Sequence, residues 1–181
     1  MEHTFSLRQM AHKIVGTTDE AAIESAFQVL RGWSNRDVIR GERQGTGRTS
    51  PMGYTLAEVC RAAILFTLRR SLGIEGEALL IMGERITNYR RVSEGPGPVE
   101  ANFRVTFPRL VKAVAAGEEW FLRVAIIRDR KTGEIKHYLQ YGPPRALRAA
   151  DYSTDPQFAL MGVLDLHMSE VLRPVMGTAN A

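Results

Sequence analysis

The segment from Leu30 to Val59 constrains the fold of this chain most strongly. Its first part predicts the end of an amphipathic helix that turns into a short strand at the apolar pair Val38-Ile39. Its middle part is rich in arginine and glycine and has no large apolar side chain to anchor it to a core. Its last part begins a new helix, because Thr55 and Glu58 have capping-box spacing, in which each side chain bonds the other's backbone N–H. Helix, two short strands joined by a basic loop, then helix: this order predicts a winged helix-turn-helix.

Motifs in this segment resemble the MerR-type winged-helix DNA-binding domains. In that family the recognition helix ends in a Leu-Arg-aromatic-aromatic signature followed by a short apolar pair. The sequence Leu30-Arg31-Gly32-Trp33 resembles this signature, with Gly32 in place of an aromatic residue. Asp37, just before the apolar pair, stands where the family usually has glycine.

Two flanking motifs extend the resemblance to residues 5–73. The family's wing returns through an Arg-Tyr-Ser-x-x-Asp-Val element, which residues 54–59 (Tyr-Thr-Leu-Ala-Glu-Val) resemble. Residues 5–11 resemble the family's opening residue and first helix, whereas the gap between Gly16 and Leu30 is longer than usual. The resemblance implies that Arg31 contacts the DNA backbone.

The helix before the loop also has a surface suited to DNA. Asp19 or Thr18 can cap it, and its apolar stripe leaves Ser25, Gln28 and Arg31 on the opposite face. Short polar groups and arginine are the side chains that a major-groove helix uses. Glu20 and Glu24 have the wrong sign for a phosphate surface, unless they point away at the helix start, where the dipole favours acids.

The basic charge of the chain is concentrated in the expected wing. The whole chain has a net charge of +4, and between residues 31 and 48 five arginines face two acids. Arginines on a glycine-bearing wing can reach phosphates or a minor groove. The predicted DNA-binding residues are therefore Ser25, Gln28, Arg31, Arg36, Arg40, Arg43 and Arg48.

The rest of the chain predicts a second, α+β module with a mostly antiparallel sheet. Helices are expected at 55–72 and 77–91, and a linker at 93–98 separates a DNA-binding domain (1–92) from a dimerisation or effector module (99–181). In that module we expect strands at 102–107, 120–128, 135–141 and 158–166, and helices at 108–116 and from 167 to about 175.

The sequence shows no constellation typical of an enzyme. Its four histidines lack the i, i+4 pairing or cysteine partners of metal sites. The segment 45–50 is glycine-rich but lacks the Gly-Lys-Ser/Thr ending of a phosphate loop. We therefore expect no catalytic activity, no metal and no cofactor.

Composition favours a cytoplasmic protein without a membrane partner. No apolar run approaches the ~18 residues that span a bilayer, and the N-terminus has no secretory signal pattern. The single cysteine, Cys60, cannot form an internal disulfide.

These observations predict a sequence-specific binder of double-stranded DNA, a bacterial or phage transcriptional regulator. A homodimer is expected, because one such domain covers too little DNA for tight specific binding. One alternative is a DNA-recognition subunit of a phage packaging or partition machine. Another is a winged-helix protein–protein adaptor that binds no DNA. The sequence does not show whether the second module binds a small-molecule effector.

Overall fold

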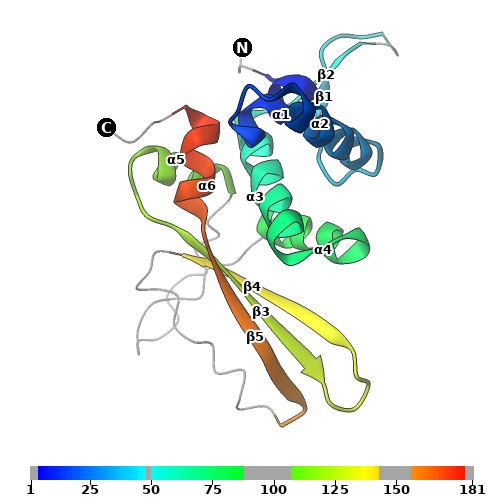
Figure 1. The fold of residues 1–181 in the computed structure, drawn as a ribbon, viewed down its shortest axis with the longest axis vertical. Helices are drawn as coiled ribbons and strands as arrows, with labels where there is room; N and C mark the ends of the chain where they lie inside the picture. The colour runs from blue at the N-terminus through cyan, green and yellow to red at the C-terminus, as the bar shows by residue number, and fades with distance from the viewer. Residues whose placement is uncertain (1–3, 48–49, 88–106, 143–155, 178–181) are drawn as a thin grey trace. The chain divides into compact units, whose positions relative to one another are not determined.

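The chain folds into two compact units of helices and antiparallel sheets. The computed structural model describes residues 4–47, 50–87, 107–142 and 156–177. Unit 1 comprises Met1–Gly83 together with Glu170–Ala181, and unit 2 comprises Glu84–Ser169 (Figure 1). The expected linker at 93–98 lies outside the described residues. The predicted α+β class is confirmed.

Two short helices open unit 1. α1 spans Leu7–Val15 and begins with a reciprocal capping box between Ser6 and Gln9. It ends at Gly16, whose φ of 65° is the left-handed conformation that glycine adopts without steric cost. α2 spans Glu20–Asn35, and Asp19 caps it by accepting a hydrogen bond from the Ala21 N–H.

The third helix forms the centre of unit 1. α3 spans Leu56–Leu72 and is buried along most of its length, from Val59 to Leu68. Trp33 of α2 is 2% exposed and meets the ring of Phe66 edge-on at 6.4 Å. Such aromatic pairs stabilise beyond their buried area by roughly 0.5–1.5 kcal/mol. The apolar stripe of α2 therefore reaches α3 at Trp33, while along its length α2 lies mainly against α1.

A small hairpin separates α2 from α3. β1 (Glu42–Arg43) pairs antiparallel with β2 (Met52–Gly53). An isolated bridge between Phe5 and Tyr54 ties the start of the chain to the base of this hairpin. The apolar pair at 38–39 is buried but forms no strand, so the sequence prediction of a strand there was wrong.

Two further helices contribute to both units. α4 spans Gly76–Thr87, shorter than the expected 77–91, of which residues 88–91 lie outside the described part. α6 spans Met168–Met176, and its residues from Glu170 onward belong to unit 1. Within that unit, Lys13 of α1 donates a hydrogen bond to the Val175 carbonyl of α6 at 2.9 Å.

Unit 2 is built on a three-stranded antiparallel sheet. Its strands are β3 (Phe121–Asp129), β4 (Ile135–Gly142) and β5 (Phe158–His167), in the order β4-β3-β5. The three strands match the sequence prediction closely. The expected strand at 102–107 falls mostly outside the described residues, and Phe107 instead begins helix α5 (Phe107–Ala115).

None of the described helices combines the length and apolar character needed to cross a membrane.

The buried thiol of Cys60 gives a direct test of the packing of α3. Its side chain is fully buried, and this burial raises the pKa of the thiol to about 12. Since the thiolate is the reactive form, Ellman's reagent at pH 8 should modify the folded protein at least about a thousandfold more slowly than the protein in 6 M guanidinium. A native rate within tenfold of the unfolded rate would contradict this burial.

Candidate nucleic-acid interface

The exposed side of α2 carries the three side chains predicted to read DNA. Ser25, Gln28 and Arg31 are all exposed, while Ile23 and Leu30 on the other side are buried. Three-residue spacing advances around a helix in steps of about 60°, so the three side chains occupy one arc of roughly 120°. Among the described residues, the Arg31 guanidinium has no hydrogen-bond or ion-pair partner. It is therefore available to an anion.

The two acids of α2 are neutralised by a residue of α1. Arg8 donates to Glu20 at 2.7 Å and to Glu24 at 3.0 Å. Glu24 also accepts a hydrogen bond from Gln28 at 2.6 Å, which with Arg8 lowers the pKa of its carboxyl. The hydrogen bond to Glu24 uses one N–H of the Gln28 side-chain amide and does not involve its carbonyl oxygen. The unfavourable charge of the acids is offset within unit 1.

The hairpin places further arginines on an exposed loop. Arg40 and Arg43 are exposed, and so is every described residue from Glu42 to Gly47. In Figure 1 the hairpin extends away from the helices of unit 1. Arg48 lies outside the described residues. The structure thus gives the described arginines of the loop the exposure that a wing requires.

The base of the hairpin is held in place from two sides. Phe5 and Tyr54 exchange backbone hydrogen bonds of 2.8 and 2.9 Å. The Tyr54 hydroxyl lies 2.7 Å from the hydroxyl of Ser34 in the last turn of α2. A side chain at Gly41 would approach the Tyr54 ring to 2.8 Å, so glycine permits this close passage of the chain.

A buried ion pair on α3 fixes the connection between α2 and the hairpin. Arg61 is 6% exposed, and its guanidinium binds both carboxylate oxygens of Glu58, at 2.5 and 2.9 Å. Arg61 also donates to the Val38 carbonyl at 2.6 Å, while Glu58 accepts the Arg40 N–H at 2.5 Å. The predicted return bond of Glu58 to Thr55 is therefore wrong, although Thr55 does cap α3 by accepting the Glu58 N–H. This role of Arg61 was not predicted from the sequence. Its position three residues after Glu58 on one helix, a spacing at which side chains can pair, would have indicated it.

Arg36 has a different setting from the other predicted residues. Its Nε donates to the Gly32 carbonyl at 3.0 Å, so the side chain folds back over the end of α2. It lies on the rim of a groove of about 560 Å³ between α2 and α4, lined also by Trp33, Val29 and Leu79. The structure does not place Arg36 on the arc formed by Ser25, Gln28 and Arg31.

Asp37 occupies a conformation that favours glycine. Its φ of 55° is the only left-handed value among the described non-glycine residues. A glycine at this position would adopt the same backbone conformation without steric cost.

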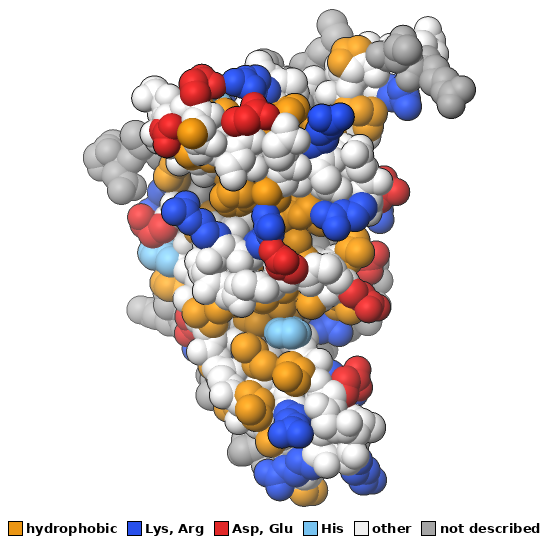
Figure 2. Space-filling model, turned by 45° about the vertical axis from the view of Figure 1, so that its right-hand side comes forward, with side chains coloured by type: hydrophobic (Ala, Val, Ile, Leu, Met, Phe, Trp, Pro, Cys, Tyr) orange, Lys and Arg blue, Asp and Glu red, His pale blue; other side chains and the backbone are white. Residues whose placement is uncertain are grey.

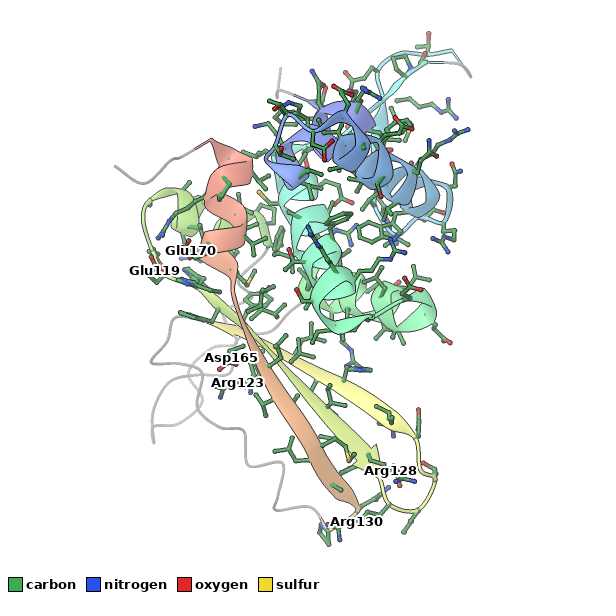
Figure 3. The ribbon with its side chains drawn as sticks, in the orientation of Figure 1. Glu119, Arg123, Arg128, Arg130, Asp165 and Glu170 are labelled. Atoms are coloured by element: carbon green, nitrogen blue, oxygen red, sulfur yellow. The ribbon has the colours of Figure 1, made fainter. Side chains whose placement is uncertain are left out.

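The acidic and histidine side chains that could suggest catalysis have structural partners. Asp165 forms a two-point ion pair with Arg123 at 2.7 Å, which lowers the pKa of its carboxyl (Figure 3). His167 pairs with Glu119 and stacks on the ring of Phe121 at 4.3 Å. Within the described part of the chain, no three ligand-type side chains are grouped to hold a metal ion.

Comparisons with known proteins identify no family for this chain. No protein-family model matches the sequence, and no curated protein matches it significantly.

Two ion pairs made by arginines of α3 allow the buried network to be tested: Arg61 with Glu58 of the same helix, and Arg69 with Glu75 beyond its end. Replacing Arg61 with alanine leaves the Glu58 charge unpaired and the Val38 carbonyl without its donor, and should lower the free energy of unfolding by about 3–5 kcal/mol. The control is Arg69→Ala, which removes the exposed pair with Glu75 and should cost less than about 1 kcal/mol. Urea denaturation measures both; equal losses would show that burial of the pair is unimportant.

Substitution of Asp37 tests the turn. Glycine should raise the free energy of unfolding by about 0.5–1 kcal/mol by relieving the left-handed strain, and valine should lower it by about 1–2 kcal/mol. Asparagine, which also tolerates this conformation, serves as the control with little change. The strain assigned to Asp37 would be contradicted if thermal or urea unfolding showed that the glycine variant is destabilised more than the valine variant.

Proposed function

We propose that the chain is a sequence-specific binder of double-stranded DNA, a bacterial or phage transcriptional regulator. The observation that carries the proposal is the arrangement of α2 and the hairpin. An exposed polar arc with an unpaired arginine is joined to an exposed arginine-bearing loop by a turn fixed on α3. In this proposal α1–α3 and the hairpin act as a MerR-type winged helix-turn-helix.

The two surfaces would have different tasks. Arg31, Arg40 and Arg43 would bind phosphates, which supplies affinity but no sequence information. Ser25 and Gln28 would contact base edges in the major groove, where hydrogen bonds distinguish base pairs. The Arg8 network would keep Glu20 and Glu24 from repelling the phosphates. We further propose a two-fold homodimer on two half-sites, since dimerisation doubles the specific contact.

A protein–protein adaptor is the second candidate. It is favoured by the groove beside α2, whose apolar floor of Trp33, Val29 and Leu79 could hold an apolar side chain of a partner. The groove is lined by Gln28 and Arg36 of α2 but not by Arg31. DNA binding through Arg31 and partner binding through the groove can therefore be separated by mutation.

The proposal predicts tight, salt-dependent binding to selected duplexes. Duplexes with a randomised core would be enriched on the protein, and affinity would be measured by fluorescence anisotropy at several salt concentrations. The double variant Arg31→Gln, Arg40→Gln should weaken binding at least about tenfold and make the slope of log K against log salt shallower by about 2. The variant Ser25→Ala, Gln28→Ala should chiefly reduce discrimination between selected and unrelated duplexes.

The matched control is Arg109→Gln, Lys112→Gln, which removes the same charge from exposed positions on α5. It should leave the salt slope unchanged. If the wild-type protein enriches no duplex, or the control weakens binding as much as the α2–hairpin variant, DNA binding as proposed is rejected. Screening for a protein partner of the α2 groove would then be the next step.

A further inference from the structure

The turn between β3 and β4 carries a basic cluster that the proposed DNA-reading surface does not use. Its members are Arg128, Arg130 and Lys131, all exposed. Figure 2 shows Lys and Arg side chains gathered at the lower end of the view, where the sheet of unit 2 ends. Figure 3 places Arg128 and Arg130 at this end of the sheet. We call residues 128–136 the basic turn.

The acids of the basic turn are already satisfied within it. Lys136 lies 3.3 Å from Glu134 and 3.9 Å from Asp129. Among the described residues, the side chains of Arg128, Arg130 and Lys131 have neither an ion-pair nor a hydrogen-bond partner. The segment has four cations and two acids. The segment therefore has an excess of positive charge, and its three cations without a partner in the described part of the chain are the exposed side chains of Arg128, Arg130 and Lys131.

The backbone of the basic turn is fixed before any partner binds. Asp129 is 3% exposed and its carboxylate accepts hydrogen bonds from the Lys131 and Thr132 N–H groups and from Gln157. The Gly133 N–H bonds the Asp129 carbonyl, and the Arg130 N–H bonds the Gln157 carbonyl, each at 2.8 Å. A fixed backbone reduces the entropy cost of holding the cations against a partner.

The chemistry of the basic turn fits phosphates better than lipid. Residues 129–134 are Asp-Arg-Lys-Thr-Gly-Glu and include no apolar side chain to insert into a bilayer. The exposed apolar residues Leu160, Val163 and Tyr138 lie opposite Ile127 or Ala125, on the face of the sheet that does not bear the Arg128 side chain. Ile135 lies opposite Arg128 and therefore points to the other face.

We propose that the basic turn is a second phosphate-binding surface for double-stranded DNA. The inference rests on the proposed function, to which it adds a contact from unit 2. Arg128, Arg130 and Lys131 would bind backbone phosphates without reading sequence. Two phosphate-binding surfaces on one chain raise the overall affinity, because binding of the first makes the second intramolecular wherever both reach the same duplex.

The test compares two variants that lose the same charge. Arg130→Gln, Lys131→Gln should weaken binding to a selected duplex at least about tenfold and make its salt slope shallower by about 2, whereas Arg109→Gln, Lys112→Gln on α5 should leave the slope unchanged. The exchange Arg130→Lys, Lys131→Arg keeps the charge and should keep the wild-type slope. Thermal unfolding of each variant excludes loss of fold as the cause.

Each outcome supports or overturns the inference. An unchanged slope in the basic-turn variant, with wild-type binding intact, overturns it and leaves the proposed function standing. If the basic-turn variant loses DNA binding and the double variant Arg31→Gln, Arg40→Gln retains it, the inference is supported. That result also rejects α2 and the hairpin as the main DNA-binding surface. If the wild-type protein binds no duplex, both the inference and the proposed function are overturned. A membrane partner would be indicated if the wild type bound vesicles containing 30% phosphatidylserine and the basic-turn variant did not, while both bound DNA with equal affinity. That result would overturn the inference.

Discussion

The ion pair between Arg61 and Glu58 determines where the hairpin of unit 1 lies. A guanidinium removed from water needs both a counter-charge and partners for its N–H groups. Arg61 finds them in one carboxylate and in the Val38 carbonyl, a backbone group of the connection that follows α2. The same carboxylate receives the Arg40 N–H at the entry to the hairpin. One charged pair on α3 therefore positions the segment that links the proposed reading helix to its wing.

Ion pairs elsewhere in the chain also neutralise acids, but they lie on the surface and affect the electrostatic field more than the stability. Three acids are offset by a cation from another element, since Arg8 pairs with Glu20 and Glu24, and Arg123 pairs with Asp165. These exposed pairs contribute little to stability. Their effect is on the electrostatic field: with these acids neutralised, Arg31 and the side chains of Arg128, Arg130 and Lys131 remain positive groups without a partner among the described residues. Such groups attract polyanions at rates that depend on ionic strength.

Local patterns predicted most elements, and long-range contacts account for the misses. Helical periodicity and caps located α2 and α3, since the Asp19 and Thr55 caps depend only on neighbouring residues. Glu58 was misassigned because its carboxylate is bonded to Arg61 and to the Arg40 N–H, a group eighteen residues away, in preference to the nearby helix start. The buried pair at 38–39 was predicted as a strand because apolar content cannot distinguish a strand from a packed loop. Within the candidate site, exposure of Ser25, Gln28 and Arg31 follows from periodicity, whereas the folding back of Arg36 onto Gly32 does not.

The membership of α6 in unit 1 has a consequence for synthesis of the chain on the ribosome. The hydrogen bond from Lys13 to the Val175 carbonyl joins the first helix of the unit to its last. Leu172 and Val175 are buried, so the unit completes its packing only after residues 84–169 have been translated. At elongation rates of about 5–20 residues per second this delay is roughly 4–17 seconds. During that interval a nascent chain holds α1–α3 without the closing helix, so the incomplete unit 1 is exposed to chaperones and proteases.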